Sequence, residues 1–211
     1  MRESIWAAMV AGLLLLSNPA FAQLEIIKRH FAEDADLVKS LQQGGYILYW
    51  RHTKTNHEQL DQKDVDFKDC LTQRNLSSTG REQASAIGTA IKALHIKIGK
   101  TYTSPFCRCR DTAGIAFGDY EVVKGLRFSI TAGSNETRDL VQVLRKMLVD
   151  KPASGGNTVI VSHAANLKET TGLWPKPEGA MEVFRPLDDG RVEYYGKLQE
   201  QDWQRLVELN L

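Results

Sequence analysis

Two arginines and two histidines stand directly after apolar runs of the sequence. Arg51 and His52 follow "YILYW", and His163 follows "NTVIVS". Arg108 lies in "SPFCRCRDTA", just after the run "KTYTS" and in the first turn of a predicted helix. Cationic side chains that gather in one place repel one another unless an anion lies between them. We therefore predict an anion-binding site at the ends of these strands.

Phosphate is the anion that these side chains fit best. Arginine donates planar pairs of hydrogen bonds to phosphate oxygens, and a helix N-terminus beside Arg108 would add backbone N–H donors. Neighbouring arginines disfavour the imidazolium form of His52, so we expect a neutral ring that can act as a nucleophile. A buried strand would hold this ring in line with a bound phosphoryl group, and such positioning provides most of the catalysis in phosphoryl transfer.

Short apolar runs alternate with helical patterns along the chain. The runs that have the apolar pattern of strands are 45–50, 100–104, 125–130 and 157–162. The stretches with apolar residues three and four apart are 37–41, 84–94 and 140–148. This alternation predicts an α/β fold of three layers, a mostly parallel open sheet flanked by helices on both faces. Ligands of such sheets bind at the carboxyl ends of the strands.

The end of the chain has a different pattern. The runs "MEVF" and "VEYYGKL" flank "DDG", which predicts a β-hairpin. The stretch "DWQRLVEL" then predicts a closing helix with Trp203, Leu206 and Val207 turned inward.

The first 22 residues have the three parts of a secretory signal peptide: Arg2, an apolar run over 5–16, and small residues at 20 and 22. We expect cleavage after Ala22 and a single domain over 23–211, located in the periplasm or secreted. An uncleaved membrane anchor is the alternative. The apolar run is short for a membrane span, so we expect no stable span after cleavage.

Charge and cysteine content narrow the class of protein further. The formal net charge is +1, which provides no global field for binding nucleic acid or anionic lipid. Three cysteines in an exported chain predict one disulfide, from Cys70 to Cys107 or Cys109. We predict no metal site, because the Cys-x-Cys pair lacks two further ligands at suitable spacing.

Four segments resemble, in order, the motifs of the histidine phosphatase superfamily, which includes the cofactor-dependent phosphoglycerate mutases and the histidine acid phosphatases. They are "RHT" at 51–53, "QRNLSSTGREQA" at 73–84, "SPFCRCRDTA" at 104–113 and "VSHAANL" at 161–167. The resemblance spans Gly45 to about Pro186 and implies a phosphoglycerate mutase-like fold.

The resemblance also implies a role for each of the four residues. His52 would be the nucleophile that forms a phosphohistidine, Arg51 and Arg108 would clamp the phosphoryl oxygens, and His163 would donate to the phosphoryl group. It implies no metal and no organic cofactor.

The chain departs from the family pattern at two positions. Thr53 stands where glycine is usual, so its hydroxyl becomes a candidate donor to phosphate. Ala164 follows the second histidine, where the acid phosphatase branch has its aspartate proton donor. We take Glu178, on a loop that could close over the pocket, as the candidate donor. An enzyme without a donor stays open as well, since general acid catalysis contributes only ~10²–10⁴-fold.

Other side chains are weaker candidates for the site. Glu121 and Glu136 are the alternatives to Glu178 as proton donor. His57, Arg74 and Asn166 are candidates for substrate binding, with a surface position for His57 and a helix cap for Asn166 as the alternatives.

We therefore predict an exported phosphatase, a metal-independent phosphoric monoester hydrolase that acts on phosphomonoesters or other phosphoryl groups. An envelope sugar phosphate or a phosphoprotein is the expected type of substrate. One alternative is a protein of the same fold that binds phosphate or a phospho-ligand with weakened catalysis, as Thr53 and Ala164 suggest. Another is a metallohydrolase that uses His52, His57 and Asp61, although their spacing matches no known ligand set.

Overall fold

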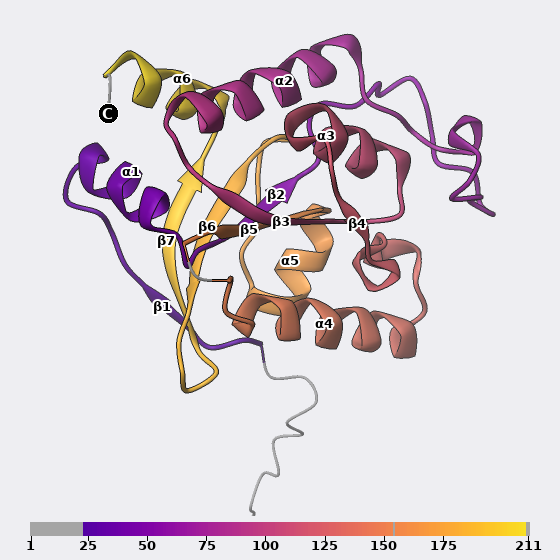
Figure 1. Cartoon of the computed structure of the whole chain (residues 1–211). Coiled ribbons are helices and arrows are strands. Elements are labelled where there is room, and N and C mark those ends of the chain that lie inside the picture. The colour runs from indigo at the N-terminus through magenta and orange to yellow at the C-terminus, as the bar shows by residue number, and fades with distance from the viewer. Residues whose placement is uncertain (1–22, 154, 210–211) are drawn as a thin grey trace, which may run out of the picture.

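The computed structural model describes residues 23–153 and 155–209, which form one seven-stranded sheet with helices on both faces (Figure 1). The strand order is β1-β7-β6-β2-β5-β3-β4. The strands are β1 (Ile26–Lys28), β2 (Ile47–Arg51), β3 (Ile98–Thr103), β4 (Glu121–Val122), β5 (Asn157–Ser162), β6 (Met181–Pro186) and β7 (Val192–Leu198). Only β6 runs antiparallel to its neighbours. The predicted three-layer, mostly parallel α/β fold is confirmed.

Helices of the described residues divide between the two faces of the sheet. The helices are α1 (Asp34–Gln43), α2 (Ser78–Ala93), α3 (Cys107–Phe117), α4 (Ser134–Val149), α5 (Ala164–Thr171) and α6 (Glu200–Glu208). Buried side chains of α1, α2, α3 and α6 share one core, and those of α4 and α5 share the other. Three short 3₁₀ turns complete the set: η2 (Cys70–Thr72), η3 (Lys124–Leu126) and η4 (Ser129–Thr131).

The strand that carries Arg51 is buried on both faces. Leu48 and Trp50 point into one core, and Ile47 and Tyr49 point into the other. A strand covered on both faces has continuous rather than alternating apolar residues, as this sequence does. Its two neighbours, β5 and β6, pair with it along its length, so its carboxyl end has little freedom to move.

The predicted strand over 125–130 is wrong. This segment forms η3 and η4, and the edge of the sheet is taken instead by β4, which pairs with Tyr102 and Thr103. The alternating apolar side chains of this segment lie in three different environments. Leu126 is buried in a core, Phe128 packs against other aromatic rings, and Ile130 is exposed. The period of two therefore reflects packing of a loop rather than strand pairing.

The other predicted elements are confirmed, including the hairpin of β6 and β7 and the closing helix with Trp203 and Leu206 buried. The strands β1 and β4 were not predicted, and α5 was implied only by the helix cap considered for Asn166. The described residues contain no helix that is both long and apolar enough to cross a membrane. The predicted signal peptide, residues 1–22, lies outside the described residues.

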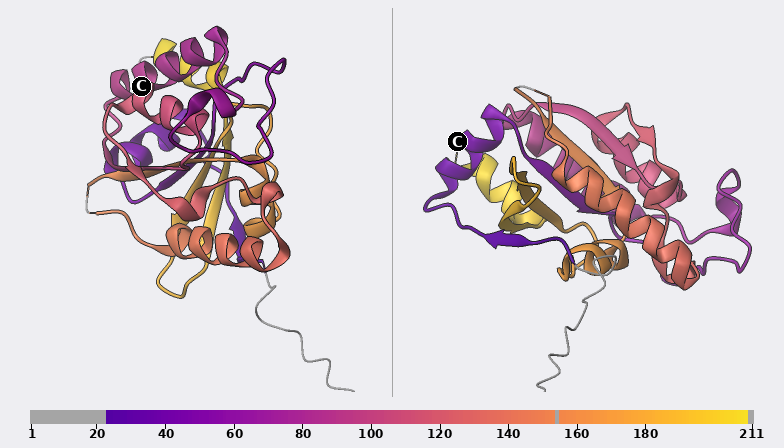
Figure 2. Two further views of the ribbon diagram at one scale, coloured as in Figure 1. Left: turned by 90° about the vertical axis from the view of Figure 1, so that its right-hand side faces the viewer. Right: turned by 90° about the horizontal axis from the view of Figure 1, so that it is seen from below.

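A long loop joins β2 to α2 and extends from the body of the molecule with η2 near its tip (Figures 1 and 2). A disulfide joins Cys70 in this loop to Cys107 at the start of α3, while Cys109 is a free, buried thiol. One of the two pairings left open by the sequence is therefore found, and it ties the loop to the helix that carries Arg108.

Candidate active site

The four residues singled out from the sequence meet at one edge of the sheet. Arg51 ends β2 opposite Ser162 of the parallel strand β5, so His52 and His163 leave the sheet side by side. Their ring centroids are 5.5 Å apart. Arg108 comes to the same place from the first turn of α3. All four line a cavity of about 120 Å³, which we call the phosphate cavity.

Three guanidinium groups surround this cavity, because Arg74 lines it together with Arg51 and Arg108. Four of their buried nitrogens have no hydrogen-bond acceptor among the described residues: the Nε atoms of all three arginines and Nη2 of Arg108. A buried donor left without a partner costs about 1–3 kcal/mol. Unsatisfied donors gathered on one cavity indicate a missing acceptor, and for guanidinium groups this acceptor is an oxyanion.

The ring of His52 is held in a defined tautomer. Its Nδ1 lies 3.0 Å from the carbonyl oxygen of Thr53. A carbonyl oxygen only accepts hydrogen bonds, so Nδ1 carries the proton and Nε2 keeps a free lone pair. Burial lowers the pKa of His52 well below its usual value, and the charge of Arg108 lowers it further. The result is a neutral imidazole whose Nε2 can act as a nucleophile.

His163 is buried beside it and is also neutral. Burial is the main cause of its lowered pKa, followed by the charge of Arg108. Ser104 Oγ lies 2.9 Å from His163 Nε2, and the Tyr49 hydroxyl donates to the His163 carbonyl oxygen at 2.7 Å. Phe128 packs on the ring with its centroid 5.0 Å away. Ser104 was missed as a positioning residue, although its place in "SPFCRCRDTA" was a signal for it.

Arg108 is fully buried, and its orientation is fixed on several sides. Its guanidinium carbon lies 4.3 Å from the centroid of the Phe106 ring. Its Nη1 donates to Asp61 Oδ1 at 2.9 Å and to the Arg74 carbonyl oxygen at 3.2 Å. The same Asp61 oxygen accepts from the Arg74 backbone N–H at 2.9 Å. Asp61 therefore fixes one side of Arg108 and leaves Nε and Nη2 for a ligand.

The contact with Arg108 changes the interpretation of Asp61, which was considered from the sequence only as a metal ligand in a metallohydrolase. Its carboxylate is engaged by Arg108, whereas His57 contacts Glu178. The described residues contain no group of three or more His, Cys, Asp or Glu side chains arranged to hold a metal ion.

Glu178 lies beside the phosphate cavity without lining it. Its carboxylate accepts from the Thr55 backbone N–H at 3.1 Å and from the Thr55 hydroxyl at 3.0 Å. It also lies 3.4 Å from Arg51 Nη2, 3.4 Å from His57 Nε2 and 4.0 Å from Arg74 Nη2. The geometry thus favours a carboxylate that orients two arginines over one that delivers a proton. The role of proton donor stays a prediction.

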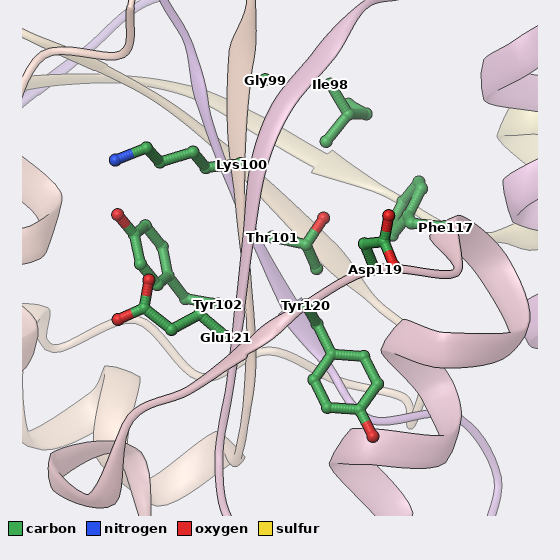
Figure 3. Close-up of a pocket in the computed structure, with 9 residues that line it drawn as sticks. All are labelled: Ile98, Gly99, Lys100, Thr101, Tyr102, Phe117, Asp119, Tyr120 and Glu121. Carbon is green, nitrogen blue, oxygen red and sulfur yellow. The ribbon is translucent and has the colours of Figure 1, made fainter.

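The two alternative donors lie away from the phosphate cavity. Glu136 forms an ion pair with Arg127 in the first turn of α4. Glu121 lies on β4 and lines a separate hollow of about 480 Å³ along the outer side of β3, which we call the edge hollow (Figure 3). Figure 3 shows Lys100 on one side of this strand and Asp119 on the other.

The predicted substrate contacts divide into two groups. Arg74 lines the phosphate cavity, and His57 lies in a neighbouring pocket beside Glu178. Thr53 is fully buried and its hydroxyl lies 3.2 Å from that of Thr112, because the chain turns its side chain toward α3. Thr53 does not line the phosphate cavity, so this geometry does not favour its predicted contact with phosphate.

Asn166 is also absent from the lining of the phosphate cavity. Its side chain accepts from the Ser129 backbone N–H at 3.3 Å and donates to the Arg127 carbonyl oxygen at 2.7 Å. Neither the predicted phosphate contact nor the helix cap is found, since His163 is the N-cap residue of α5. Asn166 instead fixes the segment that brings Phe128 to the phosphate cavity.

Comparison with known proteins agrees with this geometry. The sequence profile of the histidine phosphatase superfamily (branch 1) matches residues 47–128, a range that includes His52, Arg74 and Arg108. His163 lies beyond the matched range. No curated protein sequence matches the chain.

Solved structures share the fold at low sequence identity. The protein histidine phosphatase SixA, solved with tungstate, is 14% identical with a TM-score of 0.55, covering 74% of this chain and 98% of its own. A phosphoserine phosphatase from Entamoeba histolytica, solved with phosphoserine, is 17% identical with a TM-score of 0.52, covering 74% and 98%. A mycobacterial glucosyl-3-phosphoglycerate phosphatase is 14% identical with a TM-score of 0.51, covering 71% and 96%. The predicted resemblance to the superfamily is confirmed.

Proposed function

We propose that this chain, a member of the histidine phosphatase superfamily, is a phosphatase that hydrolyses phosphoric monoesters through a phosphohistidine on His52. The observation that carries the proposal is the set of unpartnered guanidinium N–H groups of Arg51, Arg74 and Arg108 around the free lone pair of His52 Nε2. A tetrahedral oxyanion would satisfy these donors and present its phosphorus atom to the nucleophile.

The reaction would take place in two in-line displacements. His52 Nε2 attacks phosphorus, and the bond to the leaving oxygen breaks with its electron pair going to that oxygen. Water then attacks the phosphohistidine, which releases phosphate and returns the electron pair to Nε2. Charge on the transferring group is spread over its equatorial oxygens, where the arginines and His163 would stabilise it.

The type of leaving group follows from the lining of the phosphate cavity. Among the described residues that line it, none is an aspartate or a glutamate. Without a carboxylic acid in this lining, the leaving group departs best when it needs no proton, as an aryl, acyl or phosphohistidine group does. Alkyl phosphates should react more slowly.

An exported location is part of the proposal. The Cys70–Cys107 disulfide supports it, because disulfides persist in oxidising compartments such as the periplasm and the extracellular space. The protein would then act on an envelope sugar phosphate with its ester at the anomeric carbon, or on a phosphoprotein that carries phosphohistidine. The related structures are those of a protein histidine phosphatase, a phosphoserine phosphatase and a glucosyl-3-phosphoglycerate phosphatase, which are all named for phosphorylated substrates.

The second candidate is a protein that binds a phospho-ligand in the same cavity and turns it over poorly. The absence of a carboxylic acid from the described cavity lining favours it. Measured turnover of an aryl phosphate separates the two candidates.

The test is hydrolysis of an aryl phosphate, a phosphohistidine peptide and an envelope sugar phosphate by residues 23–211. The His52→Ala variant should bind phosphate and show no turnover, and rapid quench of the natural protein should trap acid-labile, base-stable phosphate on His52. Turnover by His52→Ala at the natural rate would refute the nucleophile. No turnover of any substrate by the natural protein would favour the binding protein.

A further inference from the structure

We propose that the substrate carries a second anionic group on its leaving group, and that Lys54 and Lys176 bind this group in a pocket beside the phosphate cavity. The inference rests on the proposed function, in which the phosphate cavity takes the scissile phosphoryl group. We call the second pocket the lysine subsite. It has a volume of about 660 Å³, and its lining includes Arg51, Lys54, His57, Lys176 and Glu178.

The lysine subsite adjoins the phosphate cavity. Arg51 lines both of them. Two chain segments run from the phosphate cavity to the lysine subsite. In the first, His52 lines the cavity and Lys54 lines the subsite. In the second, Trp174 lines the cavity and Lys176 lines the subsite. The Lys176 Nζ lies 4.9 Å from the centroid of the Trp174 ring. A leaving group attached to a phosphoryl group in the cavity can therefore extend into the subsite.

The walls of the subsite are firmly held. The Lys54 carbonyl oxygen accepts from the Ser77 backbone N–H at 3.1 Å, and a side chain on Gly80 would collide with that carbonyl. The Lys54 backbone N–H donates to Gln83 Oε1 at 3.2 Å.

The same glutamine holds the opposite wall, because Gly179, at φ +85°, lies against the Gln83 side chain. The start of α2, the turn after His52 and the turn at Gly179 thus form one unit. These backbone and Gln83 contacts hold the walls of the subsite in place.

The charge of the subsite is unbalanced. Arg51, Lys54 and Lys176 are cationic, whereas Glu178 is the one carboxylate among the described residues that line it. Glu178 is already engaged by Thr55, Arg51 and His57. Among the described residues Lys54 has no ion-pair partner, and both lysines are exposed where they line the subsite. Excess positive charge in a concave site focuses the field and selects an anion.

The chemistry of the lining sets the class of the ligand. Thr79 lines the subsite together with the lysines, whereas the Ser77 hydroxyl already donates to the Lys54 carbonyl oxygen and accepts from the Gly80 backbone N–H. Hydroxyl and ammonium donors suit a carboxylate or a second phosphate. The substrate class is therefore a small phosphomonoester with a second carboxylate or phosphate a short distance from the scissile ester.

Binding of phosphonates to the natural protein, residues 23–211, tests this inference without requiring turnover. The probes are ω-phosphonoalkanoates with two to five methylene groups, each compared with its ω-carboxamide, which has the same size and no second charge. Calorimetry should give a Kd about 10-fold lower for the carboxylate than for the carboxamide at the best length, a difference of about 1.4 kcal/mol.

The preference should fall about threefold in Lys54→Met and in Lys176→Met and vanish in the double variant, while the affinity for the carboxamide stays unchanged. Lys39→Met is the matched control, since this exposed lysine lies on α1, away from the site. Circular dichroism checks the fold of each variant.

The inference would be overturned if the natural protein bound the carboxylate less than twofold more tightly than the carboxamide. It would also be overturned if the double variant kept the preference for the carboxylate. Failure of every phosphonate to bind would overturn it as well. A carboxylate preference in a protein that turns over no ester would refute the proposed phosphatase and leave the subsite standing.

Discussion

The phosphate cavity and the edge hollow differ in a way that their sizes do not suggest. The edge hollow is about 480 Å³ and the phosphate cavity about 120 Å³. Yet the edge hollow is lined by Lys100 together with Asp119 and Glu121, so its charges offset one another. The phosphate cavity gathers three guanidinium groups, and no carboxylate is found among the described residues that line it. Unsatisfied donors and unbalanced charge identify a site better than volume does.

The two regions also differ in how their side chains are held. In the phosphate cavity His52, Arg108 and His163 are buried and each is fixed by neighbours. In the edge hollow Lys100 of β3 and Glu121 of the two-residue strand β4 are exposed. Preorganised donors lose little freedom when a transition state forms, which is the basis of electrostatic catalysis.

The largest effect is expected from removing a preorganised arginine. Arg108→Ala should lower kcat/KM for an aryl phosphate by about 10²–10³-fold, because the transferring phosphoryl group loses a buried electrostatic stabiliser. Steady-state kinetics measure the loss, and circular dichroism verifies the fold. A loss below threefold in a folded variant would mean that Arg108 does not contact the phosphoryl group.

A pH effect on stability should arise from the buried histidines, which have no counterpart in the edge hollow. The pKa values of His52 and His163 are lowered in the folded protein, so below about pH 6.5 the unfolded chain binds more protons. The free energy of unfolding should then fall on acidification by up to about 1.4 kcal/mol per pH unit for each histidine.

Urea unfolding between pH 7.5 and 5.5 measures this slope. His163→Ala should reduce it by up to half, since one of the two buried titrating groups is gone. An unchanged slope in the variant would show that His163 does not contribute.

A smaller effect on activity is expected from the disulfide, which lies between the loop and the phosphate cavity. Replacing Cys70 and Cys107 by serine should lower the free energy of unfolding by about 2–4 kcal/mol. It should also lower kcat/KM by about 3–10-fold, because Arg74 follows Cys70 closely and its position depends on the tether.

A double-mutant cycle that combines the two cysteine replacements with Arg74→Ala tests whether the disulfide acts by positioning Arg74. If the disulfide acts through Arg74, the two losses in kcat/KM should be less than additive. Fully additive losses would separate the tether from Arg74.

The smallest effect is expected in the edge hollow. Lys100→Met should change kcat/KM by less than about twofold, since surface substitutions away from a site have little effect. A loss comparable to that of Arg108→Ala would reverse the comparison between the two regions.

The sequence was sufficient to predict the centre of the site. Arg51, His52 and His163 follow buried strands, and parallel strands bring such positions to one edge of a sheet. The continuous apolar run before Arg51 also predicted a buried strand. The positions of these residues depend on strands, and the spacing of apolar residues in a sequence indicates where strands lie.

The surroundings of the site could not be predicted, because they depend on the path of loops. Asp61 reaches Arg108 only through a long loop that has no repeating pattern. Thr53 lies one residue beyond His52, yet the turn of the chain buries its hydroxyl against Thr112. The apolar residues of 125–130 had the period of a strand and serve a loop that lines the phosphate cavity.

The most direct test of the central claim is a crystal structure of the natural protein, residues 23–211, soaked with vanadate. We predict vanadium within bonding distance of His52 Nε2, with its oxygens accepting hydrogen bonds from Arg51, Arg74 and Arg108. Vanadate bound in the edge hollow, or in the phosphate cavity with His52 turned away, would contradict the account.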